Sequence, residues 1–517
     1  MTRPAPRRRA WGATAAALAV VALIAGCVSW FQPLDRAPTT STPTGENVAA
    51  ELAPFYHQTL TWTGCGGGMQ CAAATAPLDW DAPTGETIEL ALIRQYATGG
   101  QPRGSLLVNP GGPGGSGVDF IRDSIDFATS DRLQRDFTIV GFDSRGVGAS
   151  TPITCADDPA QLDDYIYGIV PGERGSDDWI AATEQKNAAF GQACLSFTGD
   201  LLGEVDTASA ARDLDLLRAV LGDETLAYLG YSYGTYLGSV YAELFPDKAG
   251  RLVLDGAIDP STSEFDVTRT QATGFENALI AYLEDCVDRD DCPFAGTVQQ
   301  ARGRISALMR KLDADPIPAA DGRMLGAGTM FSAIILPLYN ESNWPYLDDL
   351  FTETFAGGTE TAFLLADSYN DRTADGSYTS NGTAAFLSIN CLDYPSDGDV
   401  ATMRAEAELL ADESPVFGPW MAYGGTLCPQ WPFLSQTERR AITAPGSPDI
   451  IVVGTTNDPA TPYVWAEALA SQLENGHLVT FQGEGHTAYG SSDCVTGVVD
   501  DFLIDGTVPT SDPNCTT

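Results

Sequence analysis

Histidine, basic residues and close cysteine pairs are scarce in this sequence. Its 517 residues include three histidines, His57, His477 and His486, and 28 lysines and arginines against 69 acidic residues. No basic patch stands out after the N-terminus, so we do not expect a nucleic-acid partner. No Cys-x-x-Cys pair occurs, and with so few histidines no metal site is expected.

The acidic excess gives a net charge of −41. A charge of this size favours solubility and is typical of a solvated acidic surface, with binding of cationic ligands as the alternative. The chain is too long for one small domain, and no internal repeat is visible. Its length suits one large α/β core with an insertion, or two to three domains.

The first 27 residues predict a signal for export. A basic start is followed by an apolar stretch at 13–25 that is too short to span a bilayer comfortably. The stretch ends in a lipobox-like sequence, and we expect its cysteine, Cys27, to carry a lipid that anchors the protein at the cell surface. The alternative is an ordinary cleaved signal and a secreted protein. Residues 28–50, rich in proline and threonine, are expected to form a flexible tether.

The other ten cysteines suit an oxidising compartment. Their even number allows five disulfides, although connectivity cannot be deduced from sequence alone. Short intervening loops favour three pairs and leave two more, in this order: Cys65–Cys71, Cys286–Cys292, Cys494–Cys515, Cys155–Cys194 and Cys391–Cys428.

Strand and helix patterns alternate along most of the chain. Strands are expected at 76–80, 87–96, 104–109, 137–142, 226–229, 251–255, 449–454 and 477–481, and helices at 207–221, 235–244, 462–472 and 494–503. This alternation predicts an α/β fold, with a mostly parallel central sheet flanked by helices.

Residues 261–430 interrupt this alternation. They predict few strands, and helices at 268–286, 297–312, 359–369 and 403–412. We therefore expect a mainly helical cap, inserted between a first part of the core at 51–260 and a C-terminal part at 431–517.

A glycine-rich turn at 230–234 has the pattern Gly-x-Ser-x-Gly, with Ser232 at its centre. A strand-like run precedes the turn and a helical run follows it, which is the context of a nucleophile elbow. Glycines permit a turn that is too tight for side chains, and the strained serine then projects above the sheet. The alternative is a strand-to-helix turn whose serine has no special role.

Two candidate partners follow strands of the C-terminal part. Asp458 and then His486 complete the chain order serine, acid, histidine, which is that of the α/β-hydrolase fold. The carboxyl ends of parallel strands share one edge, where ligands bind. Asp255 or Asp259 are alternatives for the acid. Thr461 can hydrogen-bond the Asp458 carboxylate or begin the next helix.

These residue types suit nucleophilic catalysis. The histidine takes the serine proton and delivers it to the leaving group, while the carboxylate orients the imidazole. The oxyanion that forms needs preorganised N–H donors. We expect them from Tyr233, directly after the nucleophile, and from Gly112 in the glycine-rich loop at 110–117.

Four more charged residues lie near these loops. Asp143 and Arg145 are expected to form an ion pair that braces the oxyanion loop, with substrate binding as the alternative. Asp393 and Glu484 are candidates for holding a substrate ammonium group, and the alternative for both is a solvated charge.

Five motifs together resemble one family of hydrolases, and they lie at 109–116, 143–150, 230–236, 390–393 and 457–462. The glycine-rich loop is similar to the His-Gly-Gly-Pro-Gly oxyanion loop of prolyl-aminopeptidase-like serine hydrolases. Pro110 stands in place of that histidine, which fits the secreted tripeptidyl-aminopeptidase branch and the mycobacterial cell-envelope serine hydrolases close to it.

The resemblance covers about 62–515 and implies an α/β-hydrolase core with a helical cap inserted after the sixth strand. It implies that the C-terminal part carries Asp458 and His486, that short peptides are released from free N-termini, and that no metal or organic cofactor takes part. The expected partners are peptides with a free N-terminus, and the membrane only through a lipid anchor.

We therefore expect a serine aminopeptidase that releases di- or tripeptides through an acyl-enzyme. A carboxylesterase acting on small esters or cell-envelope lipids is the first alternative. A non-catalytic surface lipoprotein that binds peptides is the second. The oligomeric state is left open.

Overall fold

The computed structural model describes residues 37–516. The expected export signal at 1–27, the lipid site Cys27 and the start of the tether lie outside the described residues. Within the described range, no helix is both long enough and apolar enough to cross a bilayer.

Residues 37–50 differ from the flexible tether that the sequence predicts. β1 (Thr39–Thr40) pairs with β2 (Thr61–Gly64), and Glu46 forms ion pairs with Arg218 and Lys248. The Arg218 side chain is fully buried and requires carboxylate partners. This part of the expected tether is therefore held on the core.

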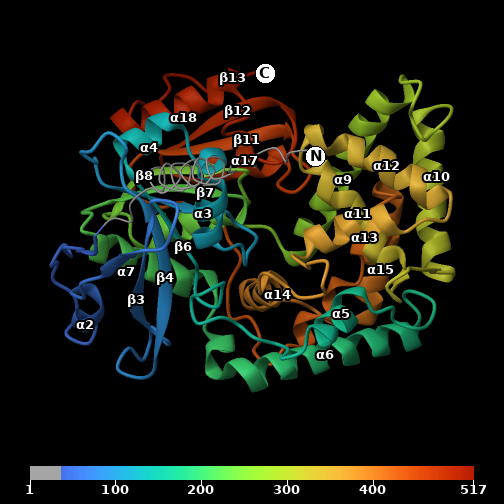
Figure 1. Cartoon of the computed structure of the whole chain (residues 1–517), viewed down its shortest axis with the longest axis horizontal. Helices are drawn as coiled ribbons and strands as arrows, with labels where there is room; N and C mark the ends of the chain where they lie inside the picture. The colour runs from blue at the N-terminus through green and yellow to red at the C-terminus, as the bar shows by residue number, and fades with distance from the viewer. Residues whose placement is uncertain (1–36, 517) are drawn as a thin grey trace, which may run out of the picture.

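An eleven-stranded sheet forms the centre of the molecule (Figure 1). Its order is β1-β2-β3-β4-β6-β5-β7-β8-β11-β12-β13, antiparallel from β1 to β6 and parallel from there on. The strands after β2 are β3 (Gln70–Pro77), β4 (Thr87–Gln95), β5 (Ser105–Asn109), β6 (Thr138–Phe142), β7 (Leu226–Tyr231), β8 (Ala249–Asp255), β11 (Ile450–Asn457), β12 (Gly476–Glu484) and β13 (Asn514–Cys515). The predicted α/β sheet is confirmed.

Each face of the sheet has its own apolar core. Along β8, Leu252 and Leu254 face one core and Val253 faces the other, because successive side chains of a strand point to opposite faces. The helices of the first core are α2 (Ala53–Tyr56), α7 (Thr207–Leu221), α8 (Tyr233–Leu244) and α17 (Tyr463–Gln472). Those of the second core are α3 (Gly117–Ala128), α4 (Asp131–Asp136) and α18 (Asp493–Asp505).

A helical cap follows β8, which is the sixth strand when counting starts at β3. Its helices are α9 (Glu264–Val287), α10 (Val298–Ala314), α11 (Ala327–Leu338), α12 (Trp344–Phe355), α13 (Glu360–Tyr369), α14 (Gly382–Asp393), α15 (Val400–Glu413) and α16 (Gly418–Met421), with a short hairpin of β9 (Ile317–Pro318) and β10 (Met324–Leu325). Helices α9 to α13 share a separate apolar core, whereas α14 packs into a core of the sheet (Figure 1).

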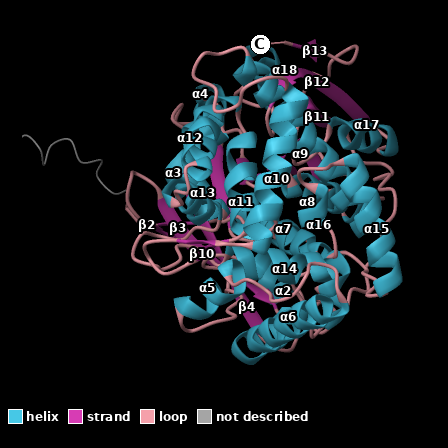
Figure 2. Cartoon of the chain, turned by 90° about the vertical axis from the view of Figure 1, so that its right-hand side faces the viewer, coloured by secondary structure: helices cyan, strands magenta, loops and turns pink. Residues whose placement is uncertain are grey.

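A second helical insertion, which the sequence analysis missed, lies between β6 and α7. It consists of α5 (Pro159–Tyr167) and α6 (Asp177–Thr198), and α6 runs below α5 along the lower edge of the molecule in both views (Figures 1 and 2). Tyr167 belongs to the apolar core of the cap. This insertion therefore extends the cap.

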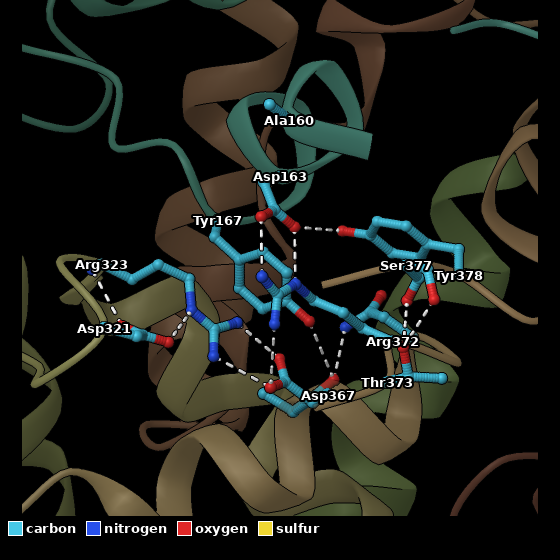
Figure 3. Close-up of polar contacts among 12 residues, drawn as sticks. Ala160, Asp163, Tyr167, Asp321, Arg323, Asp367, Arg372, Thr373, Ser377 and Tyr378 are labelled. Carbon is cyan, nitrogen blue, oxygen red and sulfur yellow. Dashed lines mark hydrogen bonds and ion pairs between the residues drawn. The ribbon is translucent and has the colours of Figure 1, made fainter. Parts of the chain in front are cut away.

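Ion pairs join α5 to the cap (Figure 3). Arg372 donates to both carboxylate oxygens of Asp163 at 2.7 and 2.8 Å, and the Tyr378 phenol donates to the same carboxylate at 2.7 Å. Asp367 of α13 accepts from Arg323 at 2.5 and 2.9 Å and from Arg372 at 3.5 Å. The segment between α13 and α14 is thus held against α5 by ion pairs and hydrogen bonds.

The ten cysteines in the described range form five disulfides. The pairs are those that the sequence analysis favours: Cys65–Cys71, Cys155–Cys194, Cys286–Cys292, Cys391–Cys428 and Cys494–Cys515. The strand expected at 76–80 is wrong in its bounds, because β3 ends at Pro77 and the Trp80 indole donates to Asp213 instead.

Candidate active site

The turn after β7 holds Ser232 in a strained conformation, with φ 54° and ψ −122°. A Cβ on Gly230 would lie 2.4 Å from the Gly234 carbonyl oxygen, and one on Gly234 would lie 2.8 Å from Asn109 Oδ1. Both distances are shorter than real Cβ contacts, so the turn favours glycine on either side of the serine.

The loops after β11 and β12 bring Asp458 and His486 together. Both carboxylate oxygens of Asp458 lie 2.9 Å from His486 Nδ1. The His486 amide donates to the carbonyl oxygen of Tyr339 at 2.9 Å, and the two rings meet edge to face. The cap therefore contacts the imidazole directly, at the segment that follows α11.

Asp458 is held by a dense set of donors. Its buried carboxylate accepts from the amides of Ala460 at 2.9 Å, Thr461 at 2.8 Å and Thr487 at 3.2 Å. The Thr461 hydroxyl donates to it at 2.9 Å, as expected from the sequence, whereas the N-cap of α17 is Pro462. These bonds fix the orientation of the carboxylate beside the imidazole.

Ser232 and His486 both lie beside the end of β8. The Ser232 amide donates to the Asp255 carbonyl oxygen at 2.8 Å. A Cβ on the next residue, Gly256, would lie 3.3 Å from His486 Cε1. Within residues 37–516 no hydrogen bond joins the Ser232 hydroxyl to the His486 ring, and such bonds are often long in free enzymes.

Asp255 supports the histidine loop from below. Its buried carboxylate accepts from the Ala488 amide at 3.0 Å and from the Tyr489 amide at 2.8 Å, and burial raises its pKa to about 6. The other alternative acid, Asp259, accepts from Ser261 and Gln472. Neither carboxylate hydrogen-bonds the imidazole among the described residues, so the geometry favours Asp458 as the acid.

The electrostatics of His486 favour its charged form. Burial lowers the pKa of the imidazole, but attraction to Asp458 and the hydrogen bond with it outweigh this, so that the pKa lies above its usual value. The arrangement can therefore stabilise the imidazolium that forms when histidine takes a proton.

The glycine-rich loop after β5 passes over the nucleophile turn. Gly111 has φ 94°, and a Cβ there would lie 2.5 Å from the Tyr231 carbonyl oxygen and 3.1 Å from the Tyr233 amide nitrogen. Gly112 follows with φ 112°. Only glycine permits so close an approach, and it places the loop beside Tyr233.

Comparisons with known proteins agree with this geometry. Residues 414–515 match the family model described as TAP-like protein. Serine protease Hip1 of Mycobacterium tuberculosis is 36% identical over 489 residues, covering 89% of this chain and 92% of that protein. A tripeptidyl aminopeptidase of Streptomyces lividans is 30% identical over 543 residues, covering 100% and 98%. The chain belongs to the TAP-like serine hydrolase family.

The carboxylesterase B of Mycobacterium tuberculosis also matches this TAP-like hydrolase, with 37% identity over 452 residues and 86% of each chain covered. The α/β-hydrolase fold and the family resemblance drawn from the sequence are thus confirmed. The chain is a serine hydrolase.

The expected ion pair between Asp143 and Arg145 is wrong. Arg145 is fully buried and donates to both carboxylate oxygens of Asp213 at 2.7 Å. Asp143 accepts from the Ser116 hydroxyl at 2.6 Å and from the Ala149 amide at 2.8 Å. It braces the end of the glycine-rich loop, as expected, but through neutral donors.

Asp393 and Glu484, the two candidates for an ammonium site, lie in different surroundings. Asp393 is only 2% exposed, and its carboxylate accepts from the amide and the hydroxyl of Thr207 at 2.9 and 2.6 Å. Burial raises its pKa to about 7. Glu484 is partly exposed beside the histidine loop and accepts from Asn457 at 2.6 Å. Its Oε2 atom is buried without a hydrogen-bond partner.

No cofactor is implied by this family resemblance, and within residues 37–516 no group of three or more histidine, cysteine or acidic side chains is placed to hold a metal ion. Sequence reasoning missed that Asp255 holds the histidine loop and that Thr207 binds Asp393. The position of Asp255 at a strand end was a signal, but its partners lie more than 230 residues away.

Proposed function

We propose that this serine hydrolase is an aminopeptidase that releases short peptides, tripeptides among them, from free N-termini. Ser232 Oγ attacks the scissile carbonyl carbon while His486 takes its proton, and Asp458 orients the imidazole. The C–N bond then breaks as His486 returns the proton to the leaving amine. Water then attacks the acyl-enzyme while His486 takes its proton. His486 returns this proton to Ser232 Oγ as the acyl group leaves.

One observation carries this proposal. His486 Nδ1 lies 2.9 Å from both oxygens of the buried Asp458, at the strand edge where Ser232 occupies its strained turn. This directs Nε2, the other ring nitrogen, away from the acid and leaves it for the serine proton. The oxyanion that forms would accept from the amides of Gly112 and Tyr233, whose loops lie against each other.

Selectivity for free N-termini is supported by Glu484. Burial raises the pKa of this carboxyl, the Asn457 bond lowers it, and repulsion from Glu341 and Glu284 raises it further. A substrate ammonium near these charges would relieve the repulsion. Asp393 does not suit this role, because Thr207 already occupies both of its oxygens.

The test is a panel of tripeptide p-nitroanilides with free and with acetylated N-termini. We expect a much higher kcat/KM for the free amines, and Glu484→Gln should raise their KM about 10-fold or more while leaving the acetylated substrates unaffected. Glu341→Gln, at an exposed position, is the matched control with a smaller effect. Equal kcat/KM for free and acetylated peptides would refute the aminopeptidase.

A carboxylesterase is the second candidate, because a relative of that name covers 86% of this chain. Both activities pass through an acyl-enzyme, so simple p-nitrophenyl esters belong in the same panel. A preference for esters with no free-amine requirement would favour the esterase. Failure of a fluorophosphonate to label Ser232 would favour the third alternative, a silent peptide-binding lipoprotein.

We also propose that the protein is exported and anchored through a lipid on Cys27, or else secreted. The support is the sequence at 1–27 alone. Metabolic labelling with a fatty-acid probe tests it, since Cys27→Ala should abolish labelling if the anchor is correct.

A further inference from the structure

Asp393, the last residue of α14, is buried against the start of α7. Its carboxylate is 2% exposed and accepts from the amide of Thr207 at 2.9 Å and from the hydroxyl of Thr207 at 2.6 Å. Thr207 is the first residue of α7 and is 1% exposed. The carboxylate thus fixes a hydroxyl at the N-terminal end of a core helix.

The Thr207 hydroxyl also reaches the residue after the nucleophile. Its oxygen lies within hydrogen-bond distance of the Tyr233 phenol. Because the Thr207 proton is donated to Asp393, the Thr207 oxygen accepts from the Tyr233 hydroxyl. Tyr233 is 5% exposed, so its ring is enclosed as well as hydrogen-bonded. A chain of two bonds therefore leads from Asp393 to Tyr233.

The opposite end of α14 contacts the other oxyanion loop. A Cβ on Gly114 would lie 2.9 Å from the Gly382 carbonyl oxygen and 3.1 Å from the Phe386 amide nitrogen. One cap helix therefore packs on the glycine-rich loop with its first turn and reaches Tyr233 with its last residue.

Charged neighbours do not replace these bonds. The Arg439 guanidinium lies between the rings of Tyr236 and Tyr394, 4.4 and 4.1 Å from their centroids, and donates to the Tyr394 phenol. Asp206 caps α7 by accepting from Ser209. The hydrogen-bond partner shared by Asp393 and Tyr233 is Thr207.

We propose that Asp393 is a positioning residue for the oxyanion hole, which holds the Tyr233 amide in place through Thr207. This rests on the function proposed above. An N–H donor stabilises the transition state only when it points at the developing oxyanion, and loss of one such donor costs about 100- to 1000-fold in rate. Loosening a donor without removing it should cost less.

The first test compares Tyr233→Phe, which breaks the bond between Tyr233 and Thr207, with Thr207→Val, which breaks both bonds of the chain. We expect each to lower kcat about 10-fold on both a tripeptide p-nitroanilide and a p-nitrophenyl ester, with KM changed less than twofold. Binding of a peptide aldehyde, which forms an oxyanion on Ser232, should weaken by the same factor as kcat, and binding of the product tripeptide should not change. The double variant should lose no more than either single variant.

Controls separate positioning from loss of structure. Tyr241→Phe removes a buried phenol of the same helix, α8, that donates to Asp215 at 3.1 Å but lies away from the turn, and it should leave kcat unchanged. Thr207→Ser keeps the hydroxyl and should restore kcat relative to Thr207→Val. Asp393→Asn should resemble Thr207→Val if it folds, and the first two variants decide the matter if it does not.

Unchanged kcat in Tyr233→Phe and Thr207→Val, multiplicative losses in the double variant, or equal weakening of aldehyde and product would each overturn the proposal. Because amide and ester substrates both pass through the oxyanion, the result does not depend on which of them is physiological. If Ser232→Ala retains activity, the proposed function fails first, and that outcome is distinct from every result above.

Discussion

The two sides of Ser232 are held in different ways. On the acid–histidine side, the backbone amides of Ala460 and Thr487 hold Asp458, and those of Ala488 and Tyr489 hold Asp255. These donors come from loops that follow strands of the sheet. On the oxyanion side, the first turn of α14 contacts Gly114. Its last residue, Asp393, is linked to Tyr233 through the Thr207 hydroxyl. The carboxylates of the first side are held mainly by backbone amides, whereas the second side is held by side chains of α7, α8 and α14.

The difference teaches where mutations can act without destroying the fold. A backbone donor cannot be removed by a side-chain change, so mutations on the acid–histidine side act through the triad residues, the Thr461 hydroxyl and the Asp255 carboxylate. The oxyanion side offers side chains remote from the substrate whose loss should change rate and leave affinity intact.

Ser232→Ala should have the largest effect, because it removes the group that both sides serve. We expect turnover to fall by about 10⁶-fold, as in other serine hydrolases that lose the nucleophile. The serine hydroxyl makes no capping bond, so the melting temperature should stay nearly unchanged. Rates and a thermal melt measure this, and retained activity in the variant would mean that another nucleophile exists.

Asp458→Asn tests the acid–histidine side and should lower kcat by about 10⁴-fold. The neutral amide no longer favours the imidazolium, so the pKa of His486, raised in the wild type, should fall. The base must be neutral to accept the serine proton. The acid limb of kcat/KM against pH should therefore move to lower pH in the variant, and a shift to higher pH would contradict the assigned pair.

Part of this site could be predicted from the sequence because its signals are local. Ser232, Asp458 and His486 each follow an apolar strand, and their order along the chain identifies the fold. The carboxylate of Asp393 looked available to substrate, but its partner Thr207 is 186 residues away, and no local pattern encodes that contact. Helix α6 was missed because its apolar residues do not form one clear stripe.

Gly112→Ala tests the oxyanion side directly. At φ 112° a Cβ would lie 2.9 Å from the amide nitrogens of Gly114 and Gly115, so the loop must move. We expect kcat to fall about 100-fold, with a smaller change in KM. Gly322→Ala is the matched control, because it has a similar φ of 94° with no atom near the added carbon. An equal loss in both variants would point to backbone strain in general, and not to the oxyanion hole.

Arg372→Lys should have the smallest effect and asks how far into the cap the oxyanion side extends. The lysine keeps the charge but loses the paired hydrogen bonds to Asp163 (Figure 3). It also loses the cation–π contact of the guanidinium with the Tyr167 ring, 6.0 Å from its centroid. Loss of one such bond costs about 1–2 kcal/mol of stability.

The Asn381 side chain holds the start of α14 without help from Arg372. It accepts from the Gly148 amide at 2.9 Å and donates to the Gly146 carbonyl oxygen at 2.8 Å. Thermal melts should therefore shift downward by a few degrees while kcat stays unchanged, and a kcat loss comparable to that of Thr207→Val would extend the positioning system from α14 to the charged network of the cap.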